Sequence, residues 1–153
     1  MHIQTISRRL IGACAVFTAV LLAGPAVALQ LITESEAALP PDQNHVRDRG
    51  ILRGPTVVIV SPPPAAGVMK SPLNLKIRFE GHGGARIDVD SVLLTYMKQP
   101  EIDLTQRLRP FIAATGIDVL DAEVPPGTHM IRVNVTDTDG HSSSTDFTFS
   151  VSK

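Results

Sequence analysis

Hydrophobic and polar side chains alternate along most of the chain after residue 55. The clearest stretch is 73–79, where Leu73, Leu75, Ile77 and Phe79 alternate with polar residues. A period of two is typical of a β-strand with one buried and one solvent-facing side. Further strands are predicted at 57–60, 92–97, 120–124, 131–135 and 147–151, with a seventh near 107–112.

Proline and glycine turns separate these strands. Three prolines follow Ser61, a Gly-rich turn follows Glu80, and Pro125-Pro126-Gly127 and Asp139-Gly140 flank the strand 131–135. Prolines end strands because they have no amide to donate. Seven short strands in roughly 100 residues predict an all-β fold, a sandwich of two antiparallel sheets.

The first 28 residues are typical of an export signal. Arg8 and Arg9 precede an apolar run from Leu10 to Ala23, and Ala26-Val27-Ala28 has the small-x-small pattern of a cleavage site. We expect residues 1–28 to be a signal peptide and the mature chain to be periplasmic or secreted.

Three other interpretations of this leader stay open. Ile11-Gly12-Ala13-Cys14 is similar to a lipoprotein cleavage box, and Ser7-Arg8-Arg9 fits a twin-arginine signal. An uncleaved anchor is the third, although the apolar run is shorter than the roughly 20 residues that cross a bilayer.

Residues 29–54 show no sustained apolar period and carry several charges, so they are predicted to be a flexible linker. The sandwich domain is then expected to span 55–153. Loss of Arg8 and Arg9 leaves 12 of the 14 basic side chains against 15 acidic ones, which argues against nucleic acid and anionic membranes as partners. No membrane insertion is expected after cleavage. Cys14, the only cysteine, would leave with the leader.

Four short motifs carry a family resemblance. They are Ile87-Asp88-Val89-Asp90-Ser91-Val92, Pro126-Gly127-Thr128-His129, Asp137-Thr138-Asp139-Gly140 and Phe147-Thr148-Phe149-Ser150-Val151. In these the chain resembles the bacterial Ig-like domains of exported proteins. The resemblance implies an Ig-like seven-stranded β-sandwich and a binding or structural role. Because one copy is present, an accessory protein of the envelope that binds another envelope protein is favoured over a stalk of repeats.

A second resemblance is to the periplasmic copper-carrier proteins of the copper-resistance family. These also end in a Pro-Gly turn, a strand, Asp-Gly-His and a final Phe-x-Phe-x-Val strand. The resemblance implies that Asp139 and His141 are copper ligands and that the protein is a copper carrier. A plain tight turn is favoured instead. Calcium at Asp137 and Asp139 is less favoured than copper, because the preceding Val133 and Val135 offer no side-chain oxygen.

The other histidines are predicted to differ in role. His129 lies in phase with Ile131 and Val133, so we expect a buried, hydrogen-bonded histidine at the corner of the sandwich. His82 lies in a glycine-rich loop, and His45 lies in the predicted linker, from which it could supply a further metal ligand.

No motif for catalysis is present in the sequence. The serines lack a nucleophile-elbow context, and neither a phosphate loop nor zinc-type histidine spacing occurs. We therefore expect a non-enzymatic protein without a cofactor.

The segment 95–112 mixes aliphatic, aromatic and basic side chains without a clean period. Tyr, Met and Arg are enriched at protein interfaces. The favoured interpretation is a crossover between strands in which Ile102, Leu104 and Phe111 are buried. If the domain binds a partner, we predict that it does so here: Lys98, Arg107 and Arg109 form a basic rim around an apolar patch, with Tyr96 in the same site, and meet an acidic partner protein.

Overall fold

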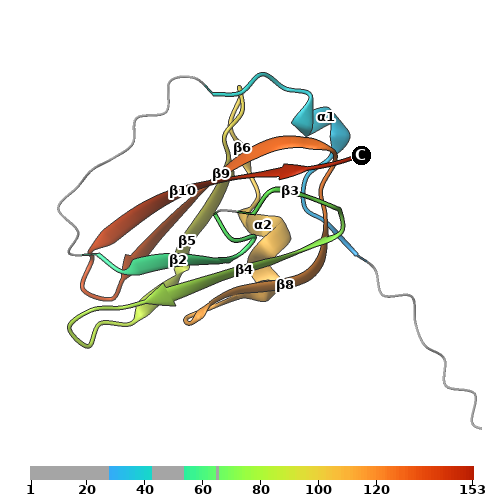
Figure 1. Cartoon of the computed structure of the whole chain (residues 1–153). Coiled ribbons are helices and arrows are strands. Elements are labelled where there is room, and N and C mark those ends of the chain that lie inside the picture. The colour runs from blue at the N-terminus through green and yellow to red at the C-terminus, as the bar shows by residue number, and fades with distance from the viewer. Residues whose placement is uncertain (1–27, 43–53, 65) are drawn as a thin grey trace, which may run out of the picture.

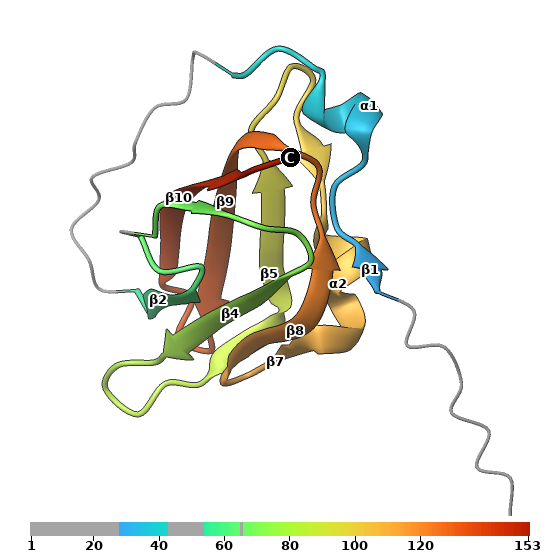
Figure 2. The same ribbon diagram turned by 45° about the vertical axis from the view of Figure 1, so that its right-hand side comes forward.

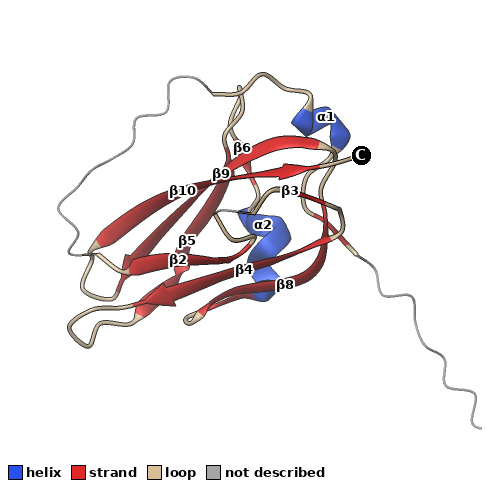
Figure 3. Ribbon diagram, viewed as in Figure 1, coloured by secondary structure: helices blue, strands red, loops and turns tan. Residues whose placement is uncertain are grey.

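The computed structural model describes residues 28–42, 54–64 and 66–153, which form two β-sheets packed face to face (Figures 1 and 3). The first sheet contains β1 (Leu29–Gln30), β2 (Thr56–Ser61), β4 (Leu73–Glu80), β7 (Ile112–Ala113) and β8 (Gly116–Glu123). The second contains β3 (Val68–Met69), β5 (Ile87–Tyr96), β6 (Ile102–Asp103), β9 (Gly127–Asp137) and β10 (Ser142–Val151). The predicted all-β fold with two packed sheets is confirmed. The described residues form ten strands in place of the expected seven.

Strand order is β1-β8-β4-β2 in the first sheet, with β7 also paired to β8, and β3-β10-β9-β5-β6 in the second. The long strands pair antiparallel, as expected, while the short edge strands β1 and β3 pair parallel to β8 and β10. In β4, every apolar residue predicted to face inward is buried and every polar neighbour is exposed. The core therefore lies between the sheets, where β4 and β8 face β5, β9 and β10.

The predicted strand near 107–112 is wrong. The chain there forms the helical turn α2 (Thr105–Leu108) and the 3-10 turn η1 (Arg109–Phe111) before β7. The Asp103 carboxylate accepts the Thr105 amide at 2.7 Å, which starts the turn. Leu104 and Leu108, one helical turn apart, are both fully buried.

A bulge changes which side chains of β8 face the core. Leu73 pairs with Ala122 and Leu75 pairs with Val119, so the one intervening residue of β4 opposes two residues of β8, Leu120 and Asp121. Asp121 takes a φ of 56° within this bulge. As a result Ala122 is buried, whereas Leu120, expected on the same face as Ala122, is 68% exposed.

The predicted linker 29–54 is wrong for its first part. Residues 28–42, here called the arm, belong to the sandwich: β1 pairs with β8, and the helical turn α1 (Glu34–Ala37) follows. Leu31 and Ile32 are 0% and 1% exposed. Two adjacent buried residues do not alternate, so the search for a period of two misses them. Figure 2 shows the arm along the β8 edge of the first sheet.

The predicted signal peptide lies outside the described residues except for Ala28, and His45 also lies outside them. Across the stretches that the structure covers, no helix has the length and apolar character needed to span a membrane.

Candidate functional site

The four residues predicted to meet a partner do not form one surface. Tyr96 is fully buried in the core. Lys98 is 7% exposed, and its ammonium donates to the Ala37 carbonyl of the arm. Arg107 also contacts the arm, whereas Arg109 does not share this site and pairs with Asp90. The prediction of an open rim for an external partner is therefore wrong for Tyr96 and Lys98. We call the surface around Lys98 and Arg107 the arm site.

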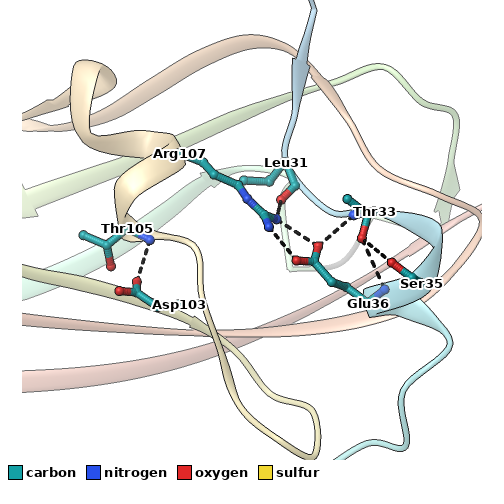
Figure 4. A network of polar contacts seen from close by, with 7 residues as sticks. All are labelled: Leu31, Thr33, Ser35, Glu36, Asp103, Thr105 and Arg107. Atoms are coloured by element: carbon teal, nitrogen blue, oxygen red, sulfur yellow. Dashed lines mark hydrogen bonds and ion pairs between the residues drawn. The ribbon is translucent and has the colours of Figure 1, made fainter.

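Arg107 of α2 forms hydrogen bonds with two residues of the arm, Leu31 and Glu36 (Figure 4). Its Nη1 donates to the Leu31 carbonyl at 2.8 Å and to Glu36 Oε2 at 2.9 Å, and its Nη2 donates to Glu36 Oε1. Both side chains are largely shielded, with 32% of Arg107 and 17% of Glu36 exposed. The hydrogen-bonded guanidinium lowers the pKa of Glu36 to about 2, and the same bond raises the pKa of Arg107.

Glu36 also completes the first turn of α1. The Thr33 amide donates to Glu36 Oε2 at 2.9 Å, and the Glu36 amide donates to Thr33 Oγ1 at 3.3 Å. This reciprocal pair is a capping box, in which each side chain accepts a hydrogen bond from a backbone amide that the start of a helix leaves unpaired. One carboxylate therefore joins the local structure of the arm to the cation on α2.

Lys98 binds the other end of α1. Its Nζ donates to the carbonyls of Ala37 and Leu39, both at 2.8 Å, and these groups lie at or just after the end of the helix. The ammonium also lies 5.3 Å from the centre of the Tyr96 ring. Burial lowers the pKa of Lys98. The arm site thus places one cation against a carboxylate and another against free carbonyls.

Tyr96 and His129 form a buried polar pair beneath this site. The Tyr96 hydroxyl lies 2.8 Å from His129 Nδ1, and His129 Nε2 lies 2.9 Å from the Pro125 carbonyl. The carbonyl can only accept, so Nε2 carries the proton and Nδ1 accepts from Tyr96. Burial raises the pKa of Tyr96 to about 12 and lowers the pKa of His129. The predicted buried, hydrogen-bonded histidine is confirmed.

Asp139 and His141, the predicted metal ligands, lie in the turn between β9 and β10. His141 Nδ1 faces Asp137, 3.4 Å from its Oδ2, and Asp137 Oδ1 accepts the amides of Asp139 and His141. Burial alone would raise the pKa of Asp137, but these amide bonds and the imidazole hold it below its ordinary value.

Asp139 and His141 therefore lie beside a third carboxylate, that of Asp137, which is engaged by backbone amides of the turn. Within residues 28–42, 54–64 and 66–153, no three His, Cys, Asp or Glu side chains converge as ligands. His82 instead lies 2.7 Å from Thr56 Oγ1. The turn interpretation, in which Asp137 organises the backbone around Gly140 (φ 84°), accounts for the same residues.

A groove on the outer face of the first sheet was not predicted. Val60 of β2 and Phe111 of η1 line it, with Lys76, Arg78 and Asp118 beside them, and it encloses about 320 Å³. Phe111 was expected to be buried but is 38% exposed, and Val60 is 41% exposed. We call this the Phe111 groove. Its sequence signal is weak, because the lining residues come from five separate elements, β2, β4, η1, β7 and β8.

Comparisons with known proteins place this chain in no family. No family model matches it, and no curated protein matches it. Among solved structures, the crystal structure of CopC from Methylosinus trichosporium OB3b is similar over 64% of this chain and 93% of that chain, with 17% sequence identity and a TM-score of 0.44. The likeness is too slight to carry a function from one protein to the other. The two family resemblances in the sequence stay predictions.

Proposed function

We propose that this chain is an exported, non-enzymatic binding or accessory protein of the cell envelope, and that it meets its partner protein at the Phe111 groove. The export signal in the sequence and the single β-sandwich support the first part. The observation that carries the second is the grouping of exposed apolar side chains on one outer face.

That grouping distinguishes the outer face of the first sheet. Val60 and Phe111 line the groove, and Leu120 follows Asp118 by two positions on β8, so it faces the same way. The remaining large exposed apolar residues in the described ranges, Val68 and Leu93, lie on the other sheet. A contiguous apolar patch with a polar border is typical of an interaction surface.

The chemistry of the border indicates what kind of partner would fit. Lys76 pairs with Asp118 at 2.6 Å and Arg78 pairs with Glu80 at 3.0 Å, and all four side chains are about half exposed. Exposed pairs of this kind contribute only about 0–1 kcal/mol, so a partner carboxylate can compete for either cation. We expect a protein that inserts an apolar side chain between Val60 and Phe111 and places an acidic residue beside them.

Site-specific photo-crosslinking in cells tests this proposal. A photoreactive residue in place of Phe111 should give one defined adduct, and Val60→Asp in the same chain should remove it. The matched control carries the photoreactive residue in place of Val68, which is 69% exposed on the other sheet. Identical adducts from both positions, or an adduct at Phe111 that survives Val60→Asp, would overturn the proposal.

The alternative function, a periplasmic copper carrier, rests on Asp139 and His141. Cu(II) titration of the purified chain separates the two functions. A d–d absorption band that disappears in His141→Ala and in Asp139→Ala, but persists in His82→Ala, would favour the copper carrier. We expect no such band, because His141 is directed toward an Asp137 carboxylate that already accepts two amides.

A further inference from the structure

The buried imidazole of His129 is hydrogen-bonded on both sides, and the residue is 1% exposed. Nδ1 accepts from the Tyr96 hydroxyl of β5 at 2.8 Å, and Nε2 donates to the Pro125 carbonyl, in the turn before β9, at 2.9 Å. The uncharged ring of Phe149 in β10 lies against it, with 5.4 Å between ring centroids. Each nitrogen of the neutral imidazole therefore already has a partner.

Lys98 connects this buried pair to the arm. Its ammonium lies 5.3 Å from the centre of the Tyr96 ring, which lies 5.7 Å from the centre of the His129 ring. The same ammonium donates to the carbonyls of Ala37 and Leu39. The positive charge of Lys98 is one cause of the lowered pKa of His129. Because such coupling is reciprocal, a proton on His129 destabilises the buried ammonium to the same extent.

A second proton on His129 also conflicts with its hydrogen bonds. Nδ1 would then point a hydrogen at the Tyr96 hydroxyl, which must change from donor to acceptor and loses the acceptor for its own proton. The carboxylate that acts on Tyr96 from the arm, Glu36, is already paired with Arg107. The closed arm therefore disfavours the imidazolium through burial, through this hydrogen bond and through repulsion by Lys98.

The end of α1 is the part of this surrounding structure that opens with least loss. The four residues of α1 include no buried one, and Lys98 donates to carbonyls at the end of the turn. By contrast, β9 is paired with β5 on one side and β10 on the other. Movement of the Lys98 ammonium into water relieves both the repulsion and the cost of its burial, while it gives up two hydrogen bonds to the arm.

We infer that Tyr96, His129 and Lys98 form an acid-sensitive latch, in which a proton taken up by His129 drives Lys98 from its buried position and opens the end of α1 while the sandwich stays folded. Burial lowers the pKa of His129 from 6.5, so the latch responds below pH 6.5. The open arm removes the repulsion by Lys98, so the proton binds the open state more tightly and the open fraction increases as the pH falls. This inference is independent of the Phe111 groove.

Amide hydrogen exchange tests the latch in the full chain, with protection factors that correct for the intrinsic effect of pH. The reporters are the amides of Leu39 and Gln99, which donate to the Glu36 and Pro40 carbonyls. Between pH 7.5 and pH 5.5 their protection should fall by about fivefold or more, and it should stay below that of Val133 in β9. Unchanged protection of the reporters would overturn the inference. Protection equal to that of Val133 at both pH values would also overturn it, because the arm would then open only with the whole sandwich.

Two matched variants assign the response to His129. His129→Gln cannot take up the proton and should keep the reporters equally protected at both pH values, whereas His141→Gln should respond like wild type. Glu36, with a pKa of about 2, stays ionised throughout. Should His129→Gln fail to fold, Lys98→Met decides, because it keeps the apolar stem without the ammonium and should leave the reporters weakly protected at both pH values. A fall on acidification that persists in His129→Gln or in Lys98→Met would overturn the inference.

Discussion

Arg107 and Glu36, separated by 71 positions in the sequence, form a two-point ion pair that fastens the arm to the sandwich. The guanidinium meets both carboxylate oxygens and also the Leu31 carbonyl. Arg107, which the sequence analysis placed in a rim for an external partner, is thus occupied by an acidic segment of the same chain.

Loss of this ion pair should destabilise the fold. Arg107→Ala removes the guanidinium from the Leu31 carbonyl and from the shielded Glu36 carboxylate, which keeps only the Thr33 amide as a donor, so we expect a loss of about 1–3 kcal/mol in the free energy of unfolding. Arg109→Ala is the matched control, since its pair with Asp90 is exposed and should contribute about 0–1 kcal/mol. Urea denaturation of both variants measures the difference, and equal losses would contradict the role assigned to Arg107.

The same pair should make stability depend on acidity. The pKa of Glu36 is lowered from 4.5 to about 2 in the folded chain, so its contribution is complete above pH 4.5 and is lost as the pH falls toward 2. Glu36→Gln should therefore be less stable than wild type at pH 6, and the two should converge at low pH. Denaturation midpoints across this range provide the measurement; a constant gap at every pH would be inconsistent with the ion pair.

Burial of the arm predicts a large effect from one truncated side chain. Leu31 is 0% exposed, and Leu31→Ala should cost about 2–5 kcal/mol. Leu120→Ala removes the same atoms from a residue that is 68% exposed and should change stability by less than about 0.5 kcal/mol. Thermal or chemical unfolding measures both losses. A larger loss for Leu120→Ala than for Leu31→Ala would contradict the burial of the arm and the exposure of Leu120 by the β8 bulge.

The sequence alone predicted those elements whose buried and exposed residues alternate along a single strand. The alternation from Leu73 to Phe79 predicted β4 correctly, and the phase of His129 with Ile131 predicted its burial. It failed where burial depends on distant partners. Leu31 and Ile32 are adjacent and both buried, since one short segment packs between β8 and α2, and α2 is too short to show a helical period. Thr33-x-x-Glu36 after two aliphatic residues was the available signal, because it is the pattern of a capping box.

Histidine burial should produce a second pH dependence near neutrality. Burial lowers the pKa of His129 from 6.5, while the Pro125 carbonyl opposes the shift and Lys98 adds to it. Below pH 6.5 the unfolded chain therefore binds the proton first, and the free energy of unfolding should decrease as the pH falls. His129→Gln should lose this dependence in equilibrium denaturation between pH 7.5 and 5.5, whereas His141→Gln should keep it. Stability that rises on acidification would show that His129 is not held neutral by burial.

Amide hydrogen exchange at Leu31 and Ile32 tests most directly whether the arm is part of the fold. Both amides donate to the Glu123 carbonyl, at 3.0 and 3.4 Å. We predict that they exchange as slowly as the amides of Val133 and Val135 in β9, the central strand of the second sheet. Exchange at the rate of an unstructured peptide, with β9 still protected, would show that residues 28–42 are the flexible linker that the sequence pattern first indicated.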